Sequence, residues 1–141
     1  MIATTAPGAG MDTKSDRART IRHFFAAIQA GNSAALQEML APDAVTRWPQ
    51  SRERITGALA CIQVYRNYPG GSPQFRVERI TGAGATWVAE LEADYGAERW
   101  YMVSVIEFDG SRIARMTDYF GPGLPAPAWR QDWVELEAAA R

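Results

Sequence analysis

The sequence predicts an α+β domain in which helices come first and an antiparallel sheet follows. Up to Tyr68, apolar residues recur at spacings of three and four, the period of a helix with one face on a core. From Gln74 onward, apolar and polar residues alternate as they do in strands, and short glycine-containing turns separate the alternating runs. Helices followed by a meander of strands are typical of helices packed on one face of a sheet. The length of 141 residues fits one such domain.

Three helices are expected before the sheet. The first covers about residues 16–30, and Gly31 suits the left-handed position that ends a helix. The second begins at Asn32 or Ser33, which can cap it, and ends before Pro42 because proline cannot continue a helix. The third covers about residues 58–68 and is broken by the sequence PGGSP.

Strands account for most of the remaining chain. A short strand is expected in the sequence AVTRWP, followed by a polar loop, QSRERITG. The alternating pattern then predicts four strands, at residues 74–81, 86–94, 99–108 and 112–120. Asp109-Gly110 is a strong hairpin signal between the last two. The C-terminal segment is first rich in proline and then amphipathic from Trp129.

The composition favours a cytoplasmic protein. Residues 1–14 are biased toward small residues and are predicted to be a disordered tail, which leaves residues 15–141 as a single domain. The first eleven residues lack the basic and apolar regions of a secretory signal, and no apolar stretch reaches the roughly 20 residues of a membrane span. Cys61 is the only cysteine, so an intrachain disulfide is excluded.

Charge and residue counts argue against several function classes. The net charge is −1 and the arginines are scattered, so nucleic acid is not an expected partner. One cysteine and one histidine provide no zinc site, and no phosphate-binding loop is present, so no metal or cofactor is predicted. Helical spacing places His23 opposite the apolar stripe, in solvent, and Cys61 on the apolar face of the third helix, as a small core residue.

Three strings resemble the nuclear transport factor 2-like superfamily, and within it the SnoaL-like polyketide cyclases. They are IRHFFAAIQAGNSAALQEMLAPDAV, VIEFDGSRIARMTDYF and APAWRQDWVE, and together they span about residues 17–135. The resemblance implies a cone-shaped α+β barrel, with three N-terminal helices packed in a strongly bent, mostly antiparallel sheet. The mouth of such a cone admits a small lipophilic ligand.

Asp118 is the first candidate for a catalytic residue. It lies in the sequence MTDYF, within an otherwise apolar strand. An apolar cavity raises the pKa of a carboxylate and prepares it for proton transfer near neutral pH. The resemblance implies the same role, because the limonene epoxide hydrolase branch has a catalytic aspartate at the matching position. The alternative is that Asp118 only accepts hydrogen bonds at a strand end.

Glu90 is the second catalytic candidate, and its role depends on which face of its strand lines the pocket. Alternation puts Glu90 on one face and Trp87 and Leu91 on the other. If Trp87 and Leu91 pack under the helices, Glu90 is in solvent. The resemblance implies the opposite face, since Glu90 matches a pocket acid of the epoxide hydrolase branch, and two carboxylates in one cavity can serve as acid and base.

The epoxide hydrolase branch also has an arginine two residues before its strand acid, and a tyrosine and an asparagine on the short early strand. Here those places hold Val88 and the run Thr46, Arg47 and Trp48. The residues that position water are therefore missing, which argues against ordinary epoxide hydrolysis.

The pocket is expected to have aromatic and methionine walls. The side chains expected to contact the ligand are Trp48, Tyr65, Trp100, Met102 and Met116. Three functions stay open: cofactor-free acid/base catalysis such as cyclisation or isomerisation, a carrier or sensor that does not convert its ligand, and a dimerisation module. Tyr101, Val103 and Val105 make the second face of their strand apolar as well, which predicts a homodimer through the outer face of the sheet.

Overall fold

The computed structural model describes the backbone of residues 5–138 and the side chains from residue 16 onward. Three helices and two strands come first, and four further strands follow. The elements in chain order are α1 (Thr5–Ala30), α2 (Ser33–Met39), β1 (Leu40–Trp48), β2 (Glu53–Thr56), α3 (Ala58–Arg66), β3 (Gln74–Ala83), β4 (Thr86–Asp94), β5 (Arg99–Asp109), β6 (Arg112–Pro122) and the 3₁₀ turn η1 (Ala128–Trp133).

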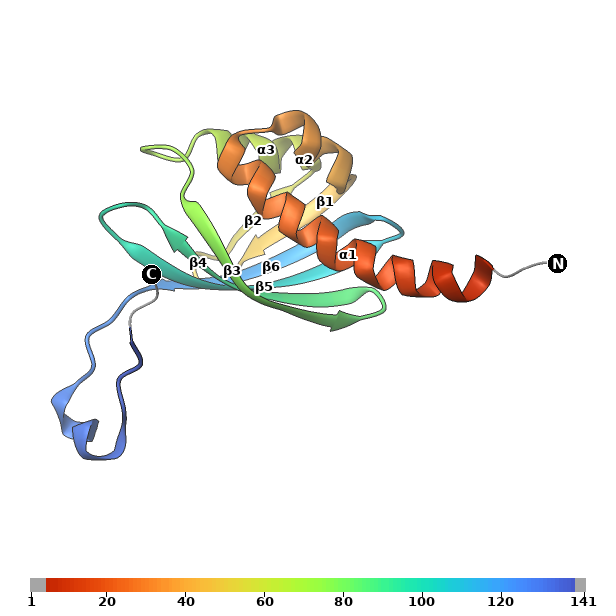
Figure 1. The fold of residues 1–141 in the computed structure, drawn as a ribbon. Helices are drawn as coiled ribbons and strands as arrows, with labels where there is room; N and C mark the ends of the chain where they lie inside the picture. The colour runs from red at the N-terminus through yellow and green to blue at the C-terminus, as the bar shows by residue number, and fades with distance from the viewer. Residues whose placement is uncertain (1–4, 139–141) are drawn as a thin grey trace.

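The six strands form one mixed sheet in the order β2-β1-β6-β5-β4-β3. Every pairing is antiparallel except that of β1 with β6, which is parallel. The sheet is curled but unclosed, because β2 and β3 remain its two edges, and the helices lie on its concave side (Figure 1). This arrangement confirms the predicted α+β cone.

The core fills the space between α1, α3 and the concave face. Phe24 of α1 is fully buried, and its ring meets those of Phe25 at 5.5 Å and Tyr65 at 6.1 Å, both edge to face. Trp87 and Leu91 of β4 are buried under the helices in the same cluster. The apolar stripe of α1 therefore fixes which face of β4 is internal.

Two local predictions differ from the structure. Helix α1 begins at Thr5, so its backbone includes residues 5–14, which were predicted to be disordered; residues 1–4 lie outside the described residues. The loop predicted after β1 contains β2, which pairs with β1 from Thr56 to Glu53. Its four residues are too few for a clear alternation, and they are ordered by the pairing rather than by their own pattern.

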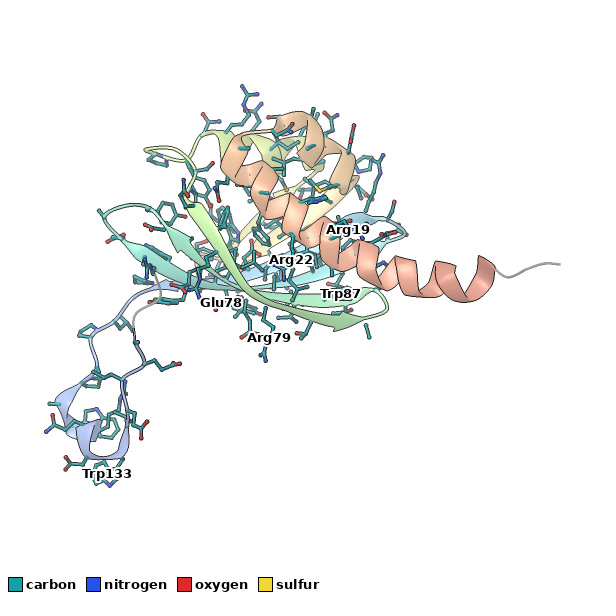
Figure 2. All side chains as sticks on the ribbon, in the orientation of Figure 1. Arg19, Arg22, Glu78, Arg79, Trp87 and Trp133 are labelled. Carbon is teal, nitrogen blue, oxygen red and sulfur yellow. The ribbon has the colours of Figure 1, made fainter. Side chains whose placement is uncertain are left out.

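The C-terminal segment leaves the sheet after β6 and projects away from the domain (Figure 1). Trp129 and Trp133 on the turn η1 are 74% and 78% exposed, and Trp133 lies at the far end of this arm (Figure 2). The helical tendency predicted from Trp129 corresponds to this short 3₁₀ turn. None of the described helices has the length and apolar character that crossing a membrane requires.

Candidate functional site

A cavity of about 490 Å³ opens between the helices and one end of the concave sheet face. Its walls are mainly aromatic and aliphatic. They come from α1, α3, the six strands and the connecting loops, and β2 contributes only its first residue, Glu53. The lining residues are Phe24, Phe25, Ile28, Trp48, Ser51, Glu53, Tyr65, Tyr68, Pro69, Phe75, Ala93, Tyr95, Glu98, Trp100, Met102, Met116, Asp118 and Phe120. This volume falls within the range of small-molecule sites, about 300–1,000 Å³.

Asp118 lies in the wall of this cavity and is held by its neighbours on two adjoining strands. Ser104 of β5 stands directly opposite Asp118 of β6, and its Oγ donates to Asp118 Oδ1 at 2.6 Å. On the other side of β6, the indole Nε1 of Trp48 on β1 donates to Asp118 Oδ2 at 3.0 Å. Both carboxylate oxygens therefore have one neutral donor each, and the carboxyl group has a fixed orientation.

Burial dominates the electrostatics of Asp118, whose exposure is 5%. Desolvation raises the pKa of Asp118 above its ordinary value, and the hydrogen bonds from Ser104 and Trp48 offset only part of that rise. None of the described residues that line the cavity is a lysine, arginine or histidine. Asp118 is thus a proton acceptor of increased basicity beside an apolar space.

The raised pKa of Asp118 predicts how stability depends on pH. Because the folded chain binds this proton more tightly than the unfolded chain, ionisation costs stability as the pH rises from the ordinary pKa of 3.8 through the folded value. We expect Asp118→Asn, which cannot ionise, to have a larger free energy of unfolding than the unaltered chain. This margin should grow as the pH rises above 3.8 and stay constant once Asp118 is ionised in the folded chain. Urea denaturation of both proteins across this pH range measures the margin. A margin that shrinks as the pH rises would contradict the assignment.

All five residues predicted to contact the ligand line the cavity. Trp48 and Trp100 flank Phe120, with ring centroids 5.8 and 6.0 Å from the Phe120 ring. Tyr65 is buried beneath them, and Met102 and Met116 face the cavity from β5 and β6. The five side chains therefore share the lining of one cavity.

The prediction that Glu90 faces the cavity is wrong. Glu90 pairs across the sheet with Arg79 of β3 and accepts a hydrogen bond from its Nε on the outer face. Arg79 extends from the side of the sheet away from the helices (Figure 2). The buried side chains of Trp87 and Leu91 take the inner face, so alternation leaves Glu90 outside.

Several residues of the site were not predicted from the sequence. Ser104 could have been found, since it follows Met102 by two residues and thus shares its face. Tyr68 and Tyr95 come from loops, and their ring centroids lie 6.3 Å apart in an edge-to-face contact. Glu98 precedes β5, and no sequence pattern indicated that its loop reaches the cavity.

His23 and Cys61 lie where helical spacing places them, in solvent and in the core. His23 is exposed on α1. Cys61 is fully buried, with its Sγ 3.5 Å from Thr46 Oγ1, and burial raises the pKa of its thiol. A buried thiol with a raised pKa is a poor nucleophile, as expected of a core residue.

Solved structures similar to this chain share its cone. An NTF-2 like protein of unknown function from Burkholderia xenovorans LB400 is 30% identical, with a TM-score of 0.80 over 89% of this chain and 98% of the other. A candidate ketosteroid isomerase from Kribbella flavida DSM 17836 is 28% identical, with a TM-score of 0.79 over 91% and 93%. An LEH-like epoxide hydrolase from M. tuberculosis is 25% identical, with a TM-score of 0.65 over 76% and 84%.

The family assignment follows from the sequence as well as from the cone. No curated protein sequence matches this chain. Residues 21–116, which run from the buried face of α1 to Met116 in the cavity wall, match the SnoaL-like domain. With the fold, the cavity and this match together, the chain belongs to the SnoaL-like family of the nuclear transport factor 2-like superfamily.

Proposed function

We propose that the cavity binds a small lipophilic carbonyl compound and that Asp118 moves a proton within it. The observation that carries this proposal is the carboxylate of Asp118, 5% exposed in an apolar wall and held by two neutral donors. A general base works best when its pKa approaches the working pH, and burial shifts Asp118 in that direction. The similar candidate ketosteroid isomerase supports this class of reaction.

The isomerisation would need no cofactor, because Asp118 would both remove and return the proton. The ionised Asp118 would take a proton from the carbon between a carbonyl and a carbon–carbon double bond, which leaves a dienolate. The protonated carboxyl group would then return this proton to the far end of the double bond, and the product would be the conjugated ketone. Neutral hydroxyl donors in the same cavity, those of Tyr65, Tyr68 and Tyr95, are available to stabilise the enolate oxygen.

An assay with a β,γ-unsaturated steroid ketone tests the proposal, because the conjugated product absorbs in the ultraviolet. Turnover that depends on Asp118 would support it. The competing function is a carrier, which the largely apolar lining also favours. Saturable binding of the ketone without turnover, together with native mass spectrometry that shows a co-purified ligand, would support the carrier instead.

We also propose that two copies of the chain pair through the outer face of the sheet. Tyr101, Val103 and Tyr119 are neighbours on that face and are 51%, 38% and 49% exposed. The projecting arm adds Trp129 and Trp133 to the apolar surface that a partner could cover. Contiguous apolar surface of this kind is typical of an interface.

The pairing predicts the effect of one charge on the outer face. Val103→Lys would place an ammonium group at the centre of the interface, so we expect this variant to sediment as a monomer at micromolar concentration while the unaltered chain sediments as a dimer. Leu59→Lys is the matched control, since Leu59 is 65% exposed on α3, away from the sheet. A monomeric unaltered chain would refute the pairing.

A further inference from the structure

The cavity has a one-sided charge pattern. Its described lining residues include three acidic side chains, Glu53, Glu98 and Asp118, and no lysine, arginine or histidine. Asp118 is buried in the wall, whereas Glu53 and Glu98 are exposed and stand at the mouth. Within the described part of the chain, neither Glu53 nor Glu98 has a basic side chain at ion-pair distance. No basic side chain between residues 16 and 138 therefore contacts either carboxylate directly.

Three aromatic rings connect the two glutamates along one wall. Glu53 is the cross-strand partner of Trp48, so both side chains stand on the same face of the β1–β2 hairpin. The Trp48 ring meets Phe120 at 5.8 Å, and Phe120 meets Trp100 at 6.0 Å. Trp100 in turn donates its indole Nε1 to Glu98 at 3.1 Å. The wall is thus a row with a carboxylate at each end and three aromatic rings between.

The indole rings in this row are held in place. The indole N–H of Trp48 donates to the carboxylate of Asp118, and the indole N–H of Trp100 donates to the carboxylate of Glu98. Ser51 Oγ donates to Glu53 Oε1 at 2.6 Å, and the Gln50 side-chain oxygen accepts from the Phe120 backbone N–H at 2.8 Å. These contacts fix the two indoles and the Phe120 backbone in the cavity wall, and aromatic ring faces carry negative potential.

Aromatic rings flanked by carboxylates are groups that bind organic cations. An ammonium group within about 6 Å of an aromatic face is attracted by roughly 0.5–2 kcal/mol, and tryptophan is the best such face. Nine of the eighteen lining residues are aromatic, and the carboxylates add attraction of the same sign. A carboxylate or phosphate on the ligand would be repelled by all three acids and would find no basic side chain among the described lining residues.

We propose that the ligand is a lipophilic amine, whose protonated nitrogen lies along the wall of Glu53, Trp48, Phe120, Trp100 and Glu98. This inference rests on the proposed function, because it assumes that the cavity is the ligand site. The apolar body of the ligand then extends inward toward Met116 and Asp118, where the reacting carbonyl group lies. The mouth selects the charge of the ligand, and the inner wall carries out the chemistry.

Three probes of similar shape test the proposal by isothermal titration calorimetry on the full chain. They are 2-(1-naphthyl)ethylamine, 2-(1-naphthyl)ethanol and 1-naphthaleneacetate. Their side chains end in a cationic ammonium group, a neutral hydroxyl group and an anionic carboxylate, respectively. We expect the amine to bind about 10-fold or more tightly than the acetate, with the alcohol between them. The double variant Glu53→Gln/Glu98→Gln should bring the amine to within about 2-fold of the alcohol. Glu90→Gln, on the outer face, should leave the preference unchanged.

The outcomes separate this inference from the proposed function. If the alcohol binds as tightly as the amine, or the acetate binds most tightly, the amine inference is wrong, while binding of the alcohol still supports a lipophilic pocket. If the double variant keeps the full preference for the amine, the glutamates are not its source and the inference is also wrong. If none of the three probes binds, the amine inference is wrong, and the proposed function still depends on turnover of the ketone.

Discussion

Asp118→Asn will lower kcat for isomerisation of a β,γ-unsaturated ketone by about 10²-fold or more, the usual scale for loss of a general acid/base. The amide has nearly the shape of the carboxyl group and still accepts a hydrogen bond from Ser104 or Trp48, so the cavity wall is retained. It cannot take up the proton, so only the chemical step is removed. Initial rates at saturating ketone measure the change, and calorimetry should show that the affinity for the ketone changes far less.

Glu90→Gln provides the matched control for that experiment. It removes a carboxylate from the same sheet, but on the outer face, where Glu90 pairs with Arg79. We expect its turnover to equal that of the unaltered chain. Unchanged turnover in Asp118→Asn would end the catalytic role of Asp118. A loss of about 1–3 kcal/mol of stability in that variant would instead indicate that Asp118 is a structural acceptor.

Phe24→Ala will lower the free energy of unfolding by about 3–5 kcal/mol, the range measured for large aromatic truncations in cores. Phe24 has no exposed surface and contacts the rings of both Phe25 and Tyr65, so its removal leaves a void where α1, α3 and the cavity floor meet. Urea denaturation of the two proteins measures the loss.

Leu59→Ala is the control for the core prediction, because Leu59 is 65% exposed on α3. Its effect should stay within about 0.5 kcal/mol. A loss below about 1 kcal/mol for Phe24→Ala would show that the helices do not depend on this contact, and would contradict the packing described for the concave face.

The sequence predicted the strands wherever alternation ran long enough to be recognised. The four C-terminal strands begin at the predicted residues, and each ends within two residues of its predicted end, because alternation over eight or more residues separates a strand clearly from its turns. Met102 and Met116 were also expected beside the ligand, and both line the cavity. Asp118 was recognised because a lone carboxylate in an apolar strand requires an explanation.

The errors have a different physical origin. Alternation divides Glu90 from Trp87 but does not state which face is internal; that choice is made by tertiary packing, which buries Trp87 and Leu91 in the core cluster. Strand β2 is created by its pairing with β1, and the loop residues Tyr95 and Glu98 reach the cavity through the curl of the sheet. These features depend on contacts between distant parts of the chain, which local patterns do not encode.

Proton transfer at carbon is the central claim, and deuterium exchange in the ketone tests it most directly. The ketone is incubated with the protein in D₂O, and the carbon between the carbonyl and the double bond is followed by NMR. If Asp118 abstracts a proton there, the unaltered chain will accelerate isomerisation, and deuterium will enter the ketone whenever the proton on Asp118 exchanges with D₂O before it is returned. Asp118→Asn will accelerate neither process. If the ketone binds in the cavity and neither isomerises nor exchanges faster than in buffer, then Asp118 is not a catalytic base for this chemistry and the proposed function is contradicted.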